Sequence, residues 1–261
     1  MKLQKCSLFG AVAGALMLTA LFAPKVSALP QEPILYFNFE GQTVPIVNSV
    51  PAPGPTSAYP RLQSRVLTQS LGFPFPSGQF TVVPGVGTTT NQLVGDVPTT
   101  NSALDLRGNT SAHGSTGMYC FNFSVDTSGA TLGASLSYAL QSIGNAGQFT
   151  TLTTAYATVA NPTQADFTTI ATHTDLQTHS TFFTYTDVLP AGALNQANLT
   201  IQFCLSGSQN DANGNHTYID NIQVNANVPE PSTYIGGFLG IGVVCWSQRR
   251  WLIRSLRFRR A

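Results

Sequence analysis

The amino-acid sequence predicts an all-β domain, built as a two-sheet antiparallel β-sandwich of the jelly-roll type. Short segments rich in Thr, Phe, Tyr, Val and Ile recur between turn-forming residues such as Gly, Asn, Asp and Pro. Several segments alternate apolar and polar residues, as in Phe121–Val125 and Leu199–Phe203, and such alternation gives a strand one buried face and one wet face. No convincing amphipathic helix occurs in residues 29–227, which contain these segments. About nine strands with long loops are typical of a jelly roll.

The predicted strands occupy residues 29–227, which we expect to form one domain. Twelve of the 16 prolines lie at or before Pro98, so residues 41–100 are expected to be mostly loop, because proline cannot donate a hydrogen bond within a sheet. The predicted strands are Ile34–Glu40, Ala103–Arg107, Met118–Val125, Ala134–Leu140, Gln148–Val159, Phe167–Ala171, Thr181–Val188, Asn198–Leu205 and Thr217–Asn225.

The first 28 residues have the three parts of a secretory signal peptide. Lys2 and Lys5 provide a positive start, and the run 7–22 is almost wholly apolar. Small residues then precede a predicted cleavage site after Ala28. The alternative is a first transmembrane helix, but the apolar run is short and Pro24 follows it. We therefore expect this segment to be a signal helix that directs export and is removed.

Charge is scarce in the chain and is sorted along it. Of the 261 residues, 9% are charged, against roughly 25% in an average soluble domain. This composition argues against a coiled coil, a charge-driven disordered tail and a nucleic-acid-binding protein. Residues 29–227 hold three arginines and ten acidic residues, giving a net charge of −7, whereas the C-terminal tail carries six arginines. Such asymmetry indicates membrane-related termini around an acidic body.

Residues 228–261 combine a Pro-Glu-Pro motif, an apolar segment and an arginine cluster. The motif is Pro229, Glu230 and Pro231, and the apolar segment predicts a transmembrane helix over about 234–247. Thirteen apolar residues span roughly 20 Å as a helix, against about 30 Å of hydrocarbon, so the segment is short for a permanent anchor. The arginines are expected to stay on the cytoplasmic side.

This three-part tail resembles the PEP-CTERM sorting signal of Gram-negative bacteria and cyanobacteria. The resemblance implies that a membrane peptidase, an exosortase, recognises Pro229, Glu230 and Pro231 and removes the tail. It also implies a location in the envelope, at the cell surface or in the extracellular matrix, often in species that make exopolysaccharide. An ordinary single-pass membrane anchor is the alternative.

The two ends of the predicted sandwich resemble carbohydrate-binding modules and related lectin-like jelly rolls. Tyr218–Val224 resembles their closing strand, and Phe37–Gly41 resembles their first strand. In those families a structural Ca²⁺ often ties the first strand to an aspartate near the last, and the resemblance names Glu40 and Asp220 as its ligands here. Oxygen ligands of this kind suit Ca²⁺. The alternative is that Asp220 binds backbone groups at the start of a strand.

Two cysteines, Cys120 and Cys204, remain after removal of the expected signal and tail. In an exported protein such a pair can form a disulfide. Cys120 shares its face of the strand with Asn122, and Cys204 shares its face with Gln202, so both are expected on the side away from the core. If their strands are neighbours, the cysteines form a cross-strand bridge. Two unpaired, partly buried thiols are the alternative.

The sequence contains no recognisable catalytic motif. Gly-x-Ser-x-Gly, His-Glu-x-x-His and phosphate-binding loops do not occur, and the four histidines have no standard metal spacing and are expected on loops and the surface. We therefore expect a non-catalytic surface or matrix protein with a polysaccharide ligand, for which Tyr138, Tyr156 and Tyr185 are candidate exposed aromatics. The alternative, and the commoner fate of such side chains, is packing in the core. The alternatives are a purely structural matrix protein and a polysaccharide-active enzyme.

Overall fold

The computed structural model describes residues 31–39, 61–63, 65, 67–69, 75, 80–93, 101–107, 118–144, 149–207, 215–227 and 246. The chain separates into residues 1–30 and 31–261, and all described residues belong to the second unit. Ala28, Glu40 and the Pro-Glu-Pro motif lie outside the described residues, as does the predicted transmembrane helix apart from Trp246. Within the described part of the chain, no helix is both long and apolar enough to cross a membrane.

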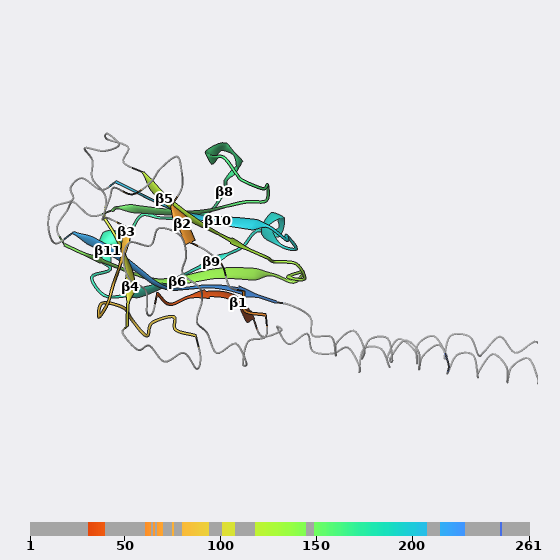
Figure 1. Cartoon of the computed structure of the whole chain (residues 1–261), viewed down its shortest axis with the longest axis horizontal. Helices are drawn as coiled ribbons and strands as arrows, with labels where there is room; N and C mark the ends of the chain where they lie inside the picture. The colour runs from red at the N-terminus through yellow and green to blue at the C-terminus, as the bar shows by residue number, and fades with distance from the viewer. Residues whose placement is uncertain are drawn as a thin grey trace, which may run out of the picture. The chain divides into compact units, whose positions relative to one another are not determined.

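Two antiparallel sheets pack face to face and form a sandwich (Figure 1), which confirms the predicted fold class. One sheet has the order β3-β4-β11-β6-β9, with β1 also paired to β11, and the other has the order β2-β5-β10-β7-β8. The strands are β1 Glu32–Phe37, β2 Leu67–Gln69, β3 Phe80–Val83, β4 Ala103–Leu106, β5 Tyr119–Val125, β6 Ala134–Ile143, β7 Thr151–Ala157, β8 Thr168–His173, β9 Phe183–Val188, β10 Leu199–Ser206 and β11 His216–Ala226.

All nine predicted strands are present, with ends shifted by a few residues. The structure adds β2 and β3, which lie inside the region 41–100 that the sequence predicted as mostly loop. They contain only three and four residues, so neither is long enough to display an alternating pattern. Each lies at the edge of its sheet and is defined by pairing with an inner strand, β5 for β2 and β4 for β3.

The long strand β11 organises the first sheet. It pairs with β6 along one side, and along the other side it pairs first with β4 and then with β1. The register with β6 shifts between Asp220 and Gln223, and Asn221 has a positive φ of 49°, a conformation that asparagine tolerates better than most residues. This bulge separates the β4-paired part of β11 from the β1-paired part.

The core between the sheets is rich in aromatic side chains. The alternation predicted for β5 is confirmed, since Phe121 and Phe123 are buried whereas Ser124 is exposed. The ring of Phe203 on β10 lies 4.9 Å from that of Phe121 and 4.9 Å from that of Tyr138. Burying one such ring contributes about 1.5–3 kcal/mol relative to leaving it exposed, so this cluster holds the two sheets together.

Candidate functional site

The predicted disulfide is present between Cys120 and Cys204. The two residues lie directly opposite each other on β5 and β10. Their neighbours Phe121 and Phe203 belong to the core cluster, so alternation places the bridge on the other face of the sheet, as predicted. Both cysteines are nevertheless at most 5% exposed. The alternative of two unpaired thiols is therefore wrong.

A pocket of about 370 Å³ lies where β1, the end of β11 and the end of β5 meet the segment 61–65. This volume falls within the usual range for small-ligand sites, roughly 300–1,000 Å³. We call it the arginine pocket. Nine residues line it: Ile34, Arg61, Gln63, Arg65, Asp126, Thr127, Ser128, Ala130 and Ala226.

Gln63 holds the walls of the arginine pocket together. Its backbone N–H donates to the carbonyl of Ile34 at 2.8 Å, which attaches the segment to β1. Its side-chain Oε1 accepts from the backbone N–H of Asp126 at 2.8 Å, and its Nε2 donates to the Asp126 carbonyl at 2.6 Å. The amide thus pairs with both backbone groups of the residue that follows β5. A pocket fixed in this way needs little ordering when a ligand binds.

The two arginines of the pocket are each anchored through Nε. Arg65 Nε donates to Gln63 Oε1 at 3.1 Å, and Arg61 Nε lies 3.5 Å from Glu32 Oε2. Among the described residues, the terminal nitrogens of Arg61 and Arg65 make no hydrogen bond. No side chain in this part of the chain competes with a ligand for these nitrogens.

Asp126 supplies the acidic group of the pocket. Its Oδ1 accepts from the backbone N–H of Ser128 at 2.7 Å. Hydrogen bonds from Ser128 hold the pKa of the Asp126 carboxyl below its ordinary value, and the charge of Arg65 lowers the pKa further. Asp126 is the one carboxylate among the nine lining residues. The pocket therefore offers cationic donors, one anionic acceptor and the hydroxyl of Ser128.

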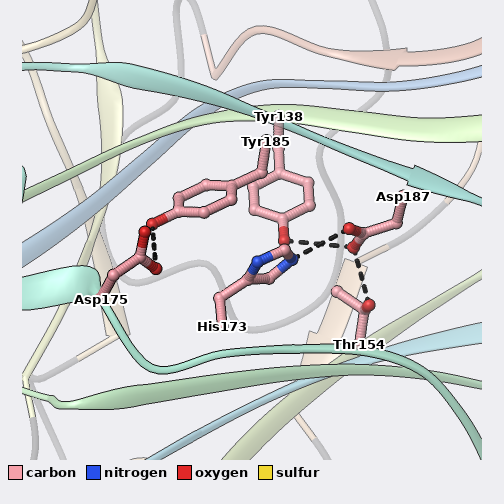
Figure 2. A network of polar contacts seen from close by, with 6 residues as sticks. All are labelled: Tyr138, Thr154, His173, Asp175, Tyr185 and Asp187. Carbon is pink, nitrogen blue, oxygen red and sulfur yellow. Dashed lines mark hydrogen bonds and ion pairs between the residues drawn. The ribbon is translucent and has the colours of Figure 1, made fainter.

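A second polar cluster lies between the sheets, with Asp187 at its centre. Figure 2 shows Tyr138 and Asp187 reaching in from one sheet and Thr154 and His173 from the other. Asp187 accepts from the hydroxyls of Thr154 at 2.8 Å and Tyr138 at 3.2 Å, and lies 2.9 Å from Nε2 of His173. Because the Thr154 hydroxyl donates to Asp187 rather than to His173, the cluster lacks the geometry of a base-activated nucleophile.

Asp175 forms the outer part of this cluster. It accepts from the Tyr185 hydroxyl at 2.9 Å and lies 3.2 Å from Nε2 of His179. The His179 ring stacks on Phe183, with centroids 4.3 Å apart and planes within 11°. Burial raises the pKa of the Tyr185 hydroxyl, and the hydrogen bond to Asp175 raises it further. Asp175 and Asp187 thus each satisfy a tyrosine hydroxyl (Figure 2).

Of the three tyrosines considered as exposed aromatics, two follow the alternative and pack in the core. Tyr138 is 0% exposed and Tyr185 is 5% exposed, because both occupy inward positions opposite each other on β6 and β9. Their rings stack at 5.6 Å. The hydroxyl of Tyr138 donates to the buried carboxylate of Asp187, and that of Tyr185 donates to the exposed carboxylate of Asp175, so neither hydroxyl is left unsatisfied. Tyr156 packs, partly buried, against the core.

Asp220 binds backbone groups, as the alternative interpretation proposed, although it lies within β11 rather than at its start. Its Oδ2 accepts from the N–H of Thr88 at 2.8 Å, and its Oδ1 accepts from the N–H of Asn221 at 2.7 Å. The bond from Thr88 holds the loop after β3 against the sheet. Because Glu40 lies outside the described residues, the calcium site remains a prediction. The described ranges contain no group of three or more His, Cys, Asp or Glu side chains that could hold a metal.

The arginine pocket was not predicted from the sequence. Arg61, Gln63 and Arg65 lie in the region predicted as loop, and Asp126 is far from them in sequence. One signal was available, since two of the three arginines in residues 29–227 are four positions apart. The pairing of Gln63 with the backbone of Asp126 depends on tertiary structure and has no local signature.

No protein-family model matches the chain, and no curated protein matches it. Solved structures with a similar arrangement of strands include the K1 cleaved adhesin domain of Lys-gingipain from Porphyromonas gingivalis (13% identity, 74% of this chain, 97% of that chain, TM-score 0.43). A CBM61 domain solved with β-1,4-galactotriose is also similar (7% identity, 61% and 86% coverage, TM-score 0.33). A third is the CBM22-2 xylan-binding domain of Paenibacillus barcinonensis Xyn10C (13% identity, 60% and 93% coverage, TM-score 0.35).

Proposed function

We propose that this chain is an exported, exosortase-processed protein of the cell surface or extracellular matrix that binds a polysaccharide and catalyses no reaction. The arginine pocket carries the proposal. A sugar presents several hydroxyls, each of which donates and accepts hydrogen bonds. The pocket matches this with guanidinium donors, the Asp126 acceptor and the Ser128 hydroxyl, all within about 370 Å³.

Export is supported by the chemistry of the chain. The Cys120–Cys204 disulfide is the kind of bond that forms and persists outside the cytosol. The signal peptide, expected to end at Ala28, directs the chain across the membrane. The tail containing Pro229, Glu230 and Pro231 is then recognised and removed by the exosortase. On this route the membrane and the exosortase are transient partners.

The composition of the pocket argues against glycoside hydrolysis. Glycosidases of the usual kind need two carboxyl groups on opposite sides of the scissile bond. Of the residues known to line the arginine pocket, only Asp126 is acidic. The carboxylates of the second polar cluster, Asp175 and Asp187, bind tyrosines and histidines instead. A binding role therefore fits the pocket better than a hydrolytic one.

Affinity electrophoresis of the full chain through gels containing neutral or acidic polysaccharides tests the proposal. We expect retardation in at least one gel and no release of reducing ends from that polysaccharide. Unchanged mobility in every gel would favour a purely structural matrix protein. Release of reducing ends that a single Asp or Glu substitution abolishes would establish an enzyme.

A further inference from the structure

We infer that the arginine pocket selects sugar residues that carry a single negative charge, as a uronic acid carboxylate or a sulfate half-ester does. The inference rests on the proposed carbohydrate-binding function and specifies its ligand. Three features of the described residues support it: the distribution of cations, the anchoring of the guanidinium groups and the acidic group beside them.

Cations are concentrated at this pocket. Residues 29–227 contain three arginines and no lysine, against ten acidic residues, yet Arg61 and Arg65 both line the same pocket. The third, Arg107, directly follows β4 and pairs with Asp105 of that strand. In a body with a net charge of −7, two neighbouring guanidinium groups form a local site for an anion.

The anchoring of these arginines leaves their ligand-binding atoms available. Arg65 is held by Gln63 and Arg61 by Glu32, in both cases through Nε. Fixing Nε restrains the guanidinium plane while leaving the two terminal nitrogens unbonded within the described structure. A paired set of N–H donors matches the two oxygens of a carboxylate or of a sulfate ester.

The acidic group in the pocket favours a singly charged ligand on a hydroxylated ring. Asp126 is a carboxylate at neutral pH, as aspartates ordinarily are, and Glu32 already offsets part of the charge of Arg61. A phosphate dianion would add two negative charges beside Asp126, whereas a carboxylate or a sulfate ester adds one. Asp126 and Ser128 can then bind the ring hydroxyls. The ligand is thus an acidic sugar rather than a bare anion.

Titration calorimetry of the full chain with matched sugars tests this inference. The probes are a trigalacturonate, its neutral methyl ester, a sulfated galactan trimer and a mannose phosphate. We expect the acid or the sulfated trimer to bind at least about tenfold more tightly than the methyl ester, since a hydrogen bond to a charged group is worth that much or more. The affinity should fall as salt is added.

Substitutions in the pocket test whether the charged trimer binds there. Arg61→Gln and Arg65→Gln are each expected to weaken binding of the charged trimer about tenfold, and Arg65→Lys, which keeps the charge but loses the paired donors, should weaken it less. Arg107→Gln makes the same charge change away from the pocket and should leave the affinity unchanged. Thermal unfolding of each variant shows whether it is folded.

The outcomes separate this inference from the proposed function. Equal binding of the trigalacturonate and its methyl ester by the unaltered chain would overturn the charge selectivity while leaving carbohydrate binding intact. Binding of the mannose phosphate alone would also overturn it. Failure of all sugars and polysaccharides to bind would overturn the proposed function itself. Preference for the carboxylated or for the sulfated trimer supports the inference and identifies the anionic group.

Discussion

At the scale of single residues, Asp187 is the polar centre of the sandwich interior. The carboxylate is 4% exposed and accepts from Thr154 and Tyr138 while facing His173. Replacing Asp187 by Ala leaves these groups without their acceptor inside a closed core. We expect the free energy of unfolding, measured with urea, to fall by about 3–5 kcal/mol.

The matched control for Asp187 is Asp166→Ala, which also removes one carboxylate. Asp166 bonds to the backbone and hydroxyl of Thr163 at an exposed turn, so its removal should change stability little. Equal stability of the two variants would show that the network around Asp187 contributes nothing to the fold.

Asp175 gives a prediction about acid stability. Burial opposes ionisation of Asp175, but hydrogen bonds from Tyr185 and His179 outweigh it and lower its pKa below the ordinary value of 3.8. A carboxyl whose pKa is lower in the folded state stabilises the fold above its unfolded pKa, and this contribution is lost as the pH falls through the folded pKa. Urea unfolding at pH 5 and below pH 4 should therefore show a smaller acid-induced loss in Asp175→Asn than in the unaltered chain.

Asp105 is expected to change the acid stability of the fold in the opposite direction. Burial raises its pKa above 3.8, although His216 and Arg107 oppose the rise. Between 3.8 and that raised value, the folded state binds a proton that the unfolded state does not, so acidification stabilises the fold through this group. Asp105→Asn should thus leave the acid-induced loss unchanged or make it larger. A smaller loss in Asp105→Asn, or an unchanged one in Asp175→Asn, would contradict these assignments.

At the scale of elements, the disulfide joins the neighbouring strands β5 and β10 across 84 positions of sequence. Closing a loop of this length lowers the entropy of the unfolded chain and contributes about 4–5 kcal/mol. We expect the double variant Cys120→Ala/Cys204→Ala to lose stability of this order in urea. Adding a reductant during unfolding should destabilise the unaltered chain and leave the double variant unaffected. Equal sensitivity to reductant would contradict this role for the bridge.

The elements that the sequence predicts well are those with local signatures. Alternation identified β5 and β10 and also placed Cys120 and Cys204 on one face. The short strands β2 and β3 have no such signature, because their pairing partners define them. The fold class and the disulfide were therefore predictable, whereas two edge strands were not.

The binding and polar sites were less predictable because their partners are distant in sequence. The sequence left Tyr138 either exposed or in the core, because the acceptor of its hydroxyl, Asp187, lies 49 positions away. In the same way, Gln63 meets Asp126 across 63 positions. Side-chain pairs of this kind depend on the tertiary structure, and the periodicity of the sequence does not predict them.

At the scale of the whole molecule, the net charge of +1 is the sum of parts with different expected fates. Under the proposed function, the positive signal segment and the arginine-rich tail are removed, and an acidic body remains outside the cell. Intact-mass analysis of protein released by the producing cells should give a chain that begins after Ala28 and ends near Pro229–Pro231. Substituting these three motif residues by Ala should keep the protein in the membrane fraction, and release of an unshortened chain would contradict the proposed route.

Binding of an acidic sugar in the arginine pocket would give this sandwich its function. A crystal structure of the full chain in complex with a trigalacturonate or a sulfated galactan trimer tests it most directly. We expect a sugar in the pocket, with its anionic group within hydrogen-bonding distance of the terminal nitrogens of Arg61 and Arg65 and its hydroxyls near Asp126. A bound sugar at another surface, with the arginine pocket containing only solvent, would contradict it.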